Sequence, residues 1–254
     1  MKKRNRFNTE SESLENQRNQ VVGKKKFTEH DLIKYYPKTE TQKLFWEAWN
    51  SGHDVLFQMG VPGTGKTAIT LWNMVYTLLT DSDYDSILIV RSPTPTVEIG
   101  FLKGDEEEKN EVYELPYRQL INEMFKYKNA YDNLKATGQL EFTTTAFLRG
   151  QTFDRKLVIF DEFQSADYHE LCTAITRVGY MSRIVFCGDA DQNDLIYARG
   201  KRETGLPLFM KIIERMNNKR RADNKIPMLE YKPADIVRSG LVQEFITAKY
   251  ELKI

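Results

Sequence analysis

One stretch, residues 55–79 (VLFQMGVPGTGKTAITLWNMVYTLL), constrains the fold more than any other part of the chain. Its centre fits the pattern G-x-x-x-x-G-K-[ST] at every defined position, with the residues Gly60, Val61, Pro62, Gly63, Thr64, Gly65, Lys66 and Thr67. Glycines allow consecutive backbone N–H groups to turn inward around a phosphate, and the positive end of the following helix points at the same place. An apolar run of strand type precedes the pattern, and apolar side chains at helical spacing follow it. This order of strand, loop and helix predicts a phosphate-binding loop.

The motif also assigns chemistry to two side chains. Lys66 is expected to reach the β- and γ-phosphates of a nucleoside triphosphate, and the Thr67 hydroxyl is expected to ligate Mg²⁺. The alternative is a Gly/Pro turn between two unrelated elements, and it does not explain why a strand and a helix flank the loop.

Composition excludes several classes of protein. The 254 residues are 41% hydrophobic and 29% charged, which is typical of a globular protein with one sizeable core. No apolar run approaches the roughly 18 residues of a membrane span, and the N-terminus lacks the apolar segment of a secretory signal, so no membrane partner is expected and the cytoplasm is the expected location. Cys172 and Cys187 lack metal-ligand spacing and the histidines are scattered, so no structural zinc site is predicted.

Charge is uneven along the chain although the formal net charge is only +1. Residues 1–28 are polar and basic and are predicted to form a disordered or loosely attached tail, with folded structure beginning near Phe27 and a single domain over residues 29–254. A second basic run covers residues 211–232. Such runs are either solvated faces or nucleic-acid contacts, and the sequence leaves both open.

A helix is predicted before the phosphate loop, with Thr39 as its N-cap. Gln42 lies three residues after the cap and has two interpretations. It is either the partner in a capping box, or an amide that reads the adenine edge beside the aromatic face of Tyr35 or Tyr36.

Two further strand ends carry polar side chains. The apolar run 157–160 ends in Asp161, predicted to hold Mg²⁺, and Glu162, predicted to orient or deprotonate a water molecule. The run 183–187 is followed by Gly188, Asp189 and Gln192, and an uncharged amide suits a γ-phosphate sensor. Taken alone, this segment is also typical of a turn, and the full calcium-loop pattern with its late Glu is absent, so the sensor role is the favoured interpretation.

The loop after the strand at residues 87–90 is a candidate nucleic-acid contact. Its prolines prevent a regular helix, and Arg91, Ser92, Thr94 and Thr96 are suited to hydrogen bonds with a phosphate backbone. The alternative is an ordinary surface loop with a solvated acidic run after it.

The motifs together resemble one family. The segments YPKTETQ, GVPGTGKT, RSPTPTVEIGFLKGDEEEK, TAFLRGQTF, VIFDEFQ, GDADQND, ETGL and DIVRSGLVQ follow one another, over residues 36–246, as in the PhoH family of ATPases, including compact versions carried by phages. That resemblance implies an α/β fold of the RecA-like P-loop NTPase type, with a mostly parallel sheet, helices on both faces and a single motor domain related to superfamily 1 helicases. It also implies ATP and Mg²⁺ as ligands, RNA or single-stranded DNA as partner, and the host cytoplasm as location if the chain is phage-encoded.

The resemblance implies roles for individual residues as well. Gln42 corresponds to the adenine-reading glutamine, and Gly188, Asp189 and Gln192 to the motif that links the γ-phosphate to nucleic acid. Arg238 is the candidate arginine finger, with Arg149, Arg199 and Arg202 as other eligible arginines. Because a single motor domain lacks the arginine of a second one, the resemblance implies a homo-oligomer, with a ring of six subunits as the expected form.

Two functions follow as hypotheses. The first is Mg²⁺-dependent ATP hydrolysis coupled to the binding or remodelling of RNA or single-stranded DNA. The second is an ATP-gated oligomeric interaction protein that does not translocate. A small-molecule kinase fits less well, because the acidic pair at Asp161 and Glu162 suits attack by water.

Overall fold

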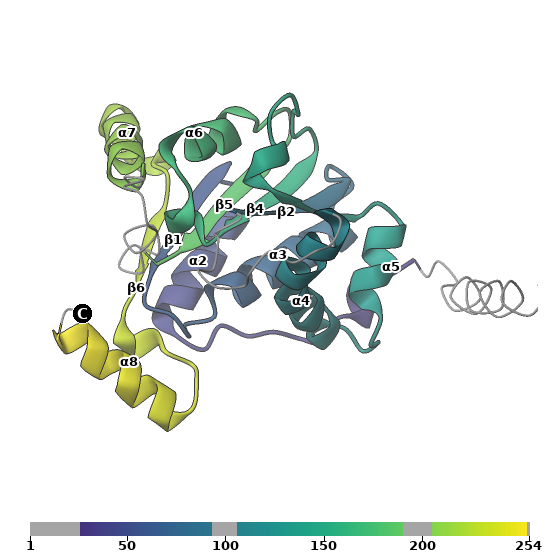
Figure 1. Ribbon diagram of the computed structural model, residues 1–254, viewed down its shortest axis with the longest axis horizontal. Coiled ribbons are helices and arrows are strands. Elements are labelled where there is room, and N and C mark those ends of the chain that lie inside the picture. The colour runs from purple at the N-terminus through teal and green to yellow at the C-terminus, as the bar shows by residue number, and fades with distance from the viewer. Residues whose placement is uncertain (1–25, 93–105, 190–204, 253–254) are drawn as a thin grey trace, which may run out of the picture.

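The computed structural model describes residues 26–92, 106–189 and 205–252, with side chains described from residue 111 onward in the second range. Its centre is a six-stranded sheet in the order β3-β2-β4-β5-β1-β6, and every described strand pair is parallel (Figure 1). The strands are β1 (Val55–Gly60), β2 (Ser86–Arg91), β3 (Leu140–Thr144), β4 (Lys156–Asp161), β5 (Arg183–Gly188) and β6 (Met228–Tyr231).

Helices cover both faces of this sheet, which confirms the predicted α/β class. On one face lie α2 (Glu40–Asn50), α3 (Lys66–Thr80), α4 (Glu106–Met124) and α5 (Ala130–Ala136), and on the other α6 (Tyr168–Thr176) and α7 (Leu206–Lys219). Successive strand residues alternate between the two cores: Leu157 of β4 packs with the first group and Val158 with the second. Strands buried on both faces need continuous apolar runs, and this is why residues 157–160 are apolar throughout.

The strand order determines where a ligand can bind. Strand β5 lies between β1 and β4, and all three run in the same direction, so their carboxyl ends meet at one edge. The loops that follow these strands are therefore neighbours in space although their residues lie far apart in the sequence. In open parallel sheets, ligands bind at this edge.

Several elements differ from the sequence-based expectations. Strand β6 was not predicted, because its four residues follow a basic polar segment. Residues 111–131, whose composition suggests one helical region, contribute to two helices, α4 and α5. Phe27 is buried with its ring centroid 4.6 Å from that of Phe125, so the fold includes it, and residues 1–25 of the predicted tail lie outside the described part.

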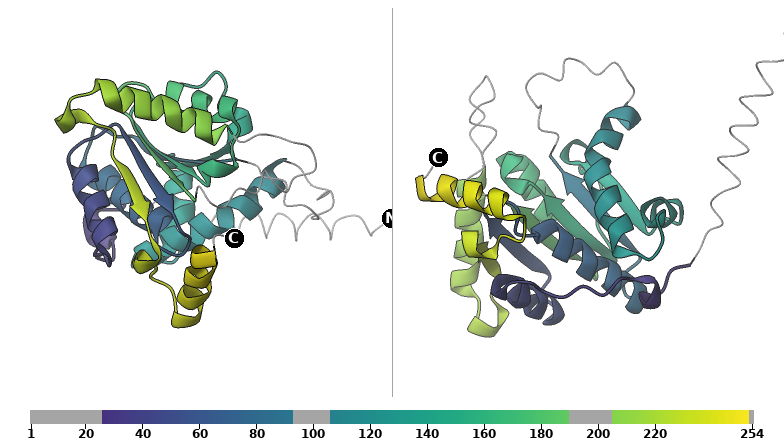
Figure 2. Two further views of the ribbon diagram at one scale, coloured as in Figure 1. Left: turned by 90° about the vertical axis from the view of Figure 1, so that its left-hand side faces the viewer. Right: turned by 90° about the horizontal axis from the view of Figure 1, so that it is seen from below.

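The C-terminal helix α8 (Gly240–Leu252) is the largest departure. The apolar residues of this segment suggest a compact core element, but Leu241 and Val242 are exposed and α8 has no buried residue. Figure 2 shows α8 projecting from the body below the edge that carries β6. Within the described ranges, no helix has the length and apolar character needed to cross a bilayer.

Candidate nucleotide-binding site

The phosphate loop joins β1 to α3 as the sequence predicts. Gly60, Gly63 and Gly65 have φ values of 121°, 77° and 78°, which residues other than glycine rarely adopt. Gly60 is also fixed by packing, because a Cβ there would overlap the backbone carbonyl of Tyr231 in β6. Gly65 caps α3, which begins at Lys66, so the positive end of that helix points into the loop.

Four carbonyls of the loop accept hydrogen bonds from other groups of the protein. The carbonyls of Gly60 and Val61 accept from Lys66 Nζ, that of Gly63 accepts from the backbone N–H of Val237, and that of Thr64 accepts from Gln42 Nε2. In contrast, no described residue provides an acceptor for the backbone N–H groups of residues 63–65. A curved row of donors without acceptors at a helix N-terminus fits an anionic phosphate group.

Lys66 lies inside this loop. Its Nζ donates to Gly60 O at 2.7 Å and to Val61 O at 2.8 Å, and its side chain is almost fully buried. Burial lowers the pKa of Lys66, while the nearby acid Asp189 opposes that shift. The ammonium group is thus held among weak dipoles, where a phosphate would be a stronger partner.

Two predicted metal ligands meet at the start of α3. Thr67 Oγ1 donates to Asp161 Oδ1 at 2.9 Å, and Tyr117 OH donates to Asp161 Oδ2 at 2.9 Å. Burial, together with the charge of neighbouring Glu162, raises the pKa of Asp161 to about 6. In the described part of the chain no group of three His, Cys, Asp or Glu side chains is arranged to hold a metal ion by itself. One hydroxyl and one carboxylate fit Mg²⁺, which usually takes its other ligands from phosphates and water.

Glu162 stands beside this pair in an unusual backbone conformation. Its φ of 53° lies in the left-handed region, which is uncommon for a residue with a side chain and is enriched at functional sites. Its carboxylate accepts from Gln164 Nε2 at 2.6 Å. Gln164 thereby holds the Glu162 carboxylate at the turn that follows β4.

Gln164 is a site residue that the sequence reasoning did not single out. Its amide is buried, donates to Glu162 and accepts from the backbone N–H of Asp189 at 3.1 Å, so it joins the tips of β4 and β5. A Cβ at Gly188 would overlap Gln164 Oε1, so the glycine makes room for this bridge. The only sequence signal was its place two residues after Glu162.

Of the other predicted site residues near this strand tip, Asp189 is buried near Lys66. Gln192, Arg199 and Arg202 lie outside the described residues.

The side chain of Gln42 contacts other groups than a capping-box partner would. Its backbone N–H donates to Thr39 Oγ1 at 3.3 Å, which confirms Thr39 as the N-cap. Its side chain is fully buried, with Nε2 donating to Thr64 O at 2.8 Å and Oε1 accepting from Lys38 N at 2.8 Å. The Gln42 amide therefore holds the backbone of the phosphate loop at Thr64. Recognition of adenine by Gln42 stays a prediction.

Arg238 lies against the phosphate loop of its own chain. Its Cγ is 3.1 Å from the position that a Cβ of Gly63 would take, and the backbone N–H of Val237 donates to Gly63 O at 3.0 Å. The side chain of Arg238 is exposed. The segment between β6 and α8 thus brings an arginine to the site in cis, and a role for Arg238 in a neighbouring subunit stays a prediction.

The predicted nucleic-acid loop is only partly described. The Arg91 guanidinium lies 5.5 Å from the ring centroid of Tyr113. Ser92 is buried and its hydroxyl donates to Glu170 Oε2 at 3.4 Å, so this arrangement does not fit the prediction that Ser92 contacts a polymer. Thr94 and Thr96 lie outside the described residues.

A buried polar cluster behind the loop was also not predicted. Tyr231 OH donates to Gln58 Oε1 at 2.5 Å, and Gln58 Nε2 donates to Thr70 Oγ1, which lies 3.3 Å from Cys187 Sγ. Buried polar groups are costly unless they are paired, so this network specifies how β6, β1, α3 and β5 fit together.

Comparison with known proteins agrees with this geometry. The family model described as PhoH-like protein matches residues 34–251. A PhoH-like protein of Mycobacterium leprae (strain TN) is 29% identical over 216 residues, which is 85% of this chain and 58% of the relative. A PhoH-like protein of Bacillus subtilis (strain 168) is 29% identical over 197 residues (77% and 58%), and Protein PhoH of Escherichia coli (strain K12) is 30% identical over 213 residues (83% and 57%). The chain thus spans less than two thirds of the length of these relatives. Since the family match includes the phosphate loop, the acidic pair and the segment around Arg238, the chain belongs to the PhoH-like protein family.

Proposed function

We propose that the protein hydrolyses ATP with Mg²⁺ and couples this reaction to the binding or remodelling of RNA or single-stranded DNA. The hydrogen bond of 2.9 Å between Thr67 Oγ1 and Asp161 Oδ1 is the observation that carries the proposal. It joins the first turn of α3 to the end of β4, residues that are 94 positions apart in the sequence. A hydroxyl and a carboxylate in contact supply oxygens for a metal ion, and the backbone N–H groups beside them supply donors for the phosphates of a metal-bound triphosphate.

Each residue of the site has one proposed task. The amides of residues 63–65 and the Lys66 ammonium bind the phosphate oxygens, and Thr67 and Asp161 hold the metal ion. When bound, Mg²⁺ neutralises charge that develops on the phosphates. Glu162 accepts a proton from water and is oriented by Gln164.

Nucleic-acid coupling and assembly are finer parts of the proposal. Gln164 supports coupling, because it connects the carboxylate of Glu162 to the backbone of Asp189 at the adjacent strand tip. A homo-oligomer, with a ring of six as the expected form, is supported by the uncovered apolar face of α8. The proposal keeps Arg238 as the candidate arginine finger, acting either on its own loop or on that of a neighbour.

Phosphate release is the direct test. The wild-type chain should release phosphate from ATP with Mg²⁺ and lose this activity in EDTA. Lys66→Ala should lower ATP affinity and turnover, whereas Glu162→Gln should keep ATP binding and lower turnover at least about 100-fold, as expected for loss of a general base. Wild-type turnover in Glu162→Gln would refute its assignment, and adding RNA, single-stranded DNA or duplex DNA would show which polymer raises the rate.

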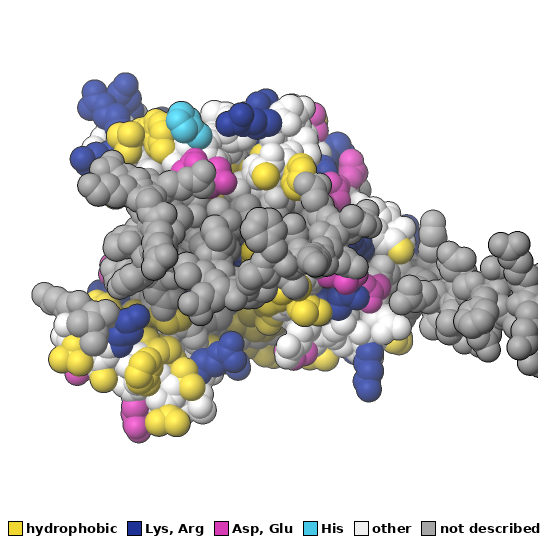
Figure 3. Space-filling view, in the orientation of Figure 1, with side chains coloured by type: hydrophobic (Ala, Val, Ile, Leu, Met, Phe, Trp, Pro, Cys, Tyr) yellow, Lys and Arg dark blue, Asp and Glu magenta, His cyan; other side chains and the backbone are white. Residues whose placement is uncertain are grey.

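A second candidate function is an ATP-gated interaction protein that assembles without translocating. The position of Ile246 favours it: its Cδ1 lies 3.6 Å from where a Cβ of Gly63 would stand, so the exposed apolar helix α8 (Figure 3) lies next to the phosphate loop. Assembly that follows ATP binding in Glu162→Gln, together with a hydrolysis rate unaffected by any nucleic acid, would favour this second function.

A further inference from the structure

Tyr117 is a buried residue beside the nucleotide site to which the proposed function gives no task. Its side chain is 1% exposed, and its hydroxyl donates to Asp161 Oδ2, while Thr67 Oγ1 donates to Asp161 Oδ1, each at 2.9 Å. The two donors come from different helices, Thr67 from α3 and Tyr117 from α4. Both oxygens of the Asp161 carboxylate are therefore held, and its plane cannot turn without breaking one of these two bonds.

The ring of Tyr117 and its hydroxyl have separate roles. The ring packs in the core beside β3, with its centroid 5.9 Å from that of Phe142. A phenylalanine would fill nearly the same volume, and it would bury no polar atom that needs a partner. Packing thus explains the ring, whereas the hydroxyl is explained by the hydrogen bond that it donates to Asp161.

This hydrogen bond leaves the Asp161 carboxylate able to bind a metal ion. A carboxylate offers about four lone-pair positions, and the donors Thr67 and Tyr117 occupy one on each oxygen. The second position on each oxygen can meet a cation or a water molecule bound to it. A group that donates to a ligand in this way typically fixes the orientation of that ligand.

Helix α4 is anchored to α5 close to Tyr117. Glu114, which lies about one turn before Tyr117, is buried and accepts from Lys135 Nζ at 2.7 Å and from Tyr131 OH at 2.9 Å. Lys135 and Tyr131 both belong to α5. A buried carboxylate with two such partners is costly to displace, so this anchor limits how far the Tyr117 hydroxyl can move from Asp161.

Helix α4 also contacts the neighbouring strand tip. Arg91 of β2 is the register partner of Asp161 in β4. The Arg91 guanidinium lies 5.5 Å from the ring centroid of Tyr113, one turn before Tyr117. One helix thus contacts two residues that are adjacent across the sheet, and the orientation of Asp161 depends on where α4 lies.

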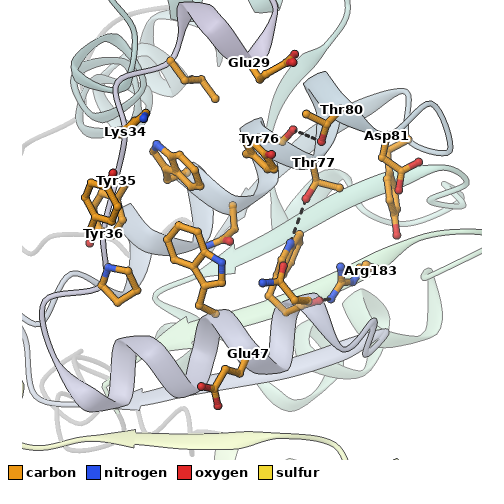
Figure 4. Close-up of a pocket in the computed structure, with 18 of the residues that line it drawn as sticks. Glu29, Lys34, Tyr35, Tyr36, Glu47, Tyr76, Thr77, Thr80, Asp81 and Arg183 are labelled. Carbon is orange, nitrogen blue, oxygen red and sulfur yellow. Dashed lines mark hydrogen bonds between the residues drawn. The ribbon is translucent and has the colours of Figure 1, made fainter.

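The groove on the α2 side of α3 is separate from this arrangement. Its volume is about 1130 Å³, and Figure 4 shows Tyr76 and Thr80 of α3 among the residues that line it. Neither Asp161 nor Tyr117 lines the groove. A change at Tyr117 therefore acts on the nucleotide site without altering the wall of the groove.

We propose that Tyr117 is a positioning residue for the metal ion of the nucleotide site. Its hydroxyl fixes the orientation of the Asp161 carboxylate, which holds Mg²⁺ together with Thr67. The inference rests on the metal site of the proposed function, but not on ATP hydrolysis or nucleic-acid coupling. Tyr117 contacts neither metal nor nucleotide in this account, so its whole effect on metal binding passes through Asp161.

The affinity for Mn²⁺, which prefers the same oxygen ligands as Mg²⁺, tests the hydroxyl. With a non-hydrolysable ATP analogue present, electron paramagnetic resonance of free Mn²⁺ should show that Tyr117→Phe binds the ion about 10-fold more weakly than wild type. Tyr131→Phe is the matched control and should bind Mn²⁺ as wild type does, because Tyr131 is equally buried and its hydroxyl donates at 2.9 Å to another carboxylate of α4, that of Glu114. Circular dichroism would confirm that both variants fold. Wild-type affinity in Tyr117→Phe, or an equal loss in both variants, would overturn the positioning role.

A double variant tests whether Tyr117 acts through Asp161. In an Asp161→Ala background, the change Tyr117→Phe should alter the Mn²⁺ affinity by at most about twofold, because the carboxylate that Tyr117 positions is gone. A further tenfold loss in the double variant would show that Tyr117 acts on metal binding by another route, and this would overturn the proposal.

The same titration separates this inference from the proposed function. A wild-type chain that adds no Mn²⁺ binding to that of the ATP analogue alone would overturn both the metal site and the positioning role. Binding that Asp161→Ala weakens and Tyr117→Phe leaves unchanged would overturn the positioning role alone, and the metal site would stand.

Discussion

At the scale of single residues, the buried carboxylate of Asp161 makes the stability of the folded state depend on pH. Its carboxylate is buried at the end of β4, and that burial raises its pKa to about 6, although Thr67 and Tyr117 both donate to it. The folded state therefore binds a proton more tightly than the unfolded chain, in which an aspartate has a pKa of about 3.9. The stability from this group is complete below pH of about 4 and is lost as the pH rises through about 6.

Asp161→Asn removes this pH-dependent loss. In EDTA and without nucleotide, the variant should be more stable than wild type above pH 7, by up to about 3 kcal/mol, and the two should converge near pH 4. Urea unfolding at several pH values measures the difference. Asp85→Asn is the control with opposite sign, because the hydrogen bond from Arg155 lowers the pKa of Asp85. A constant stability difference between Asp161→Asn and wild type from pH 4 to 8 would contradict the raised pKa.

At the scale of elements, Gln164 connects two strand tips whose side chains have different tasks. Because it orients Glu162 and holds the backbone of Asp189, Gln164→Ala should lower kcat about 10- to 100-fold, the size of effect seen when a catalytic group is misplaced by about 1 Å. The KM for ATP should change little, since the phosphate loop is intact. Steady-state kinetics measures both constants, and a raised KM with normal kcat would show that Gln164 acts in binding instead.

Strand β6 depends on a single glycine in β1. Gly60→Ala should destabilise the fold by about 3 to 4 kcal/mol, because it adds an overlap with Tyr231 to the strain of a positive φ. Gly52→Ala is the matched control: its φ is 78° with open space around the Cβ, so about 1 kcal/mol is expected. Thermal unfolding compares the two variants, and equal losses would show that backbone strain alone explains the effect.

The sequence predicts these elements unequally, for physical reasons. Strands β1, β2, β4 and β5 are apolar on both faces, and the phosphate loop has a fixed spacing, so local pattern alone identifies them. Strand β6 is short and depends on pairing with β1, and α8 has a helical pattern whose face only the structure shows to be uncovered. Tyr117 gave no signal and Gln164 only its place two residues after Glu162, because their roles come from contacts between distant segments.

At the scale of the whole molecule, the strand order brings motifs that are distant in the sequence together at one edge of the sheet. β5 lies between β1 and β4, which sets the distance between the phosphate loop and the acidic pair, and the segment after β6 returns to cover the loop with Val237 and Arg238. The same segment continues into α8, so the nucleotide site and the uncovered apolar face of α8 share one connection. A ligand that reorganises the loop at Gly63 would therefore act on α8 as well.

The most direct test of the proposed metal site between Thr67 and Asp161 is the affinity for Mn²⁺ in the presence of ATP, because Mn²⁺ can replace Mg²⁺ among oxygen ligands. Electron paramagnetic resonance would follow free Mn²⁺ during titration of wild type, Thr67→Ala, Asp161→Asn and the exposed control Asp83→Asn. Thr67→Ala and Asp161→Asn should each weaken Mn²⁺ binding at least about tenfold, as loss of a ligand or its support does, and Asp83→Asn should match wild type. Unchanged Mn²⁺ affinity in both Thr67→Ala and Asp161→Asn would contradict a metal site at the junction of α3 and β4.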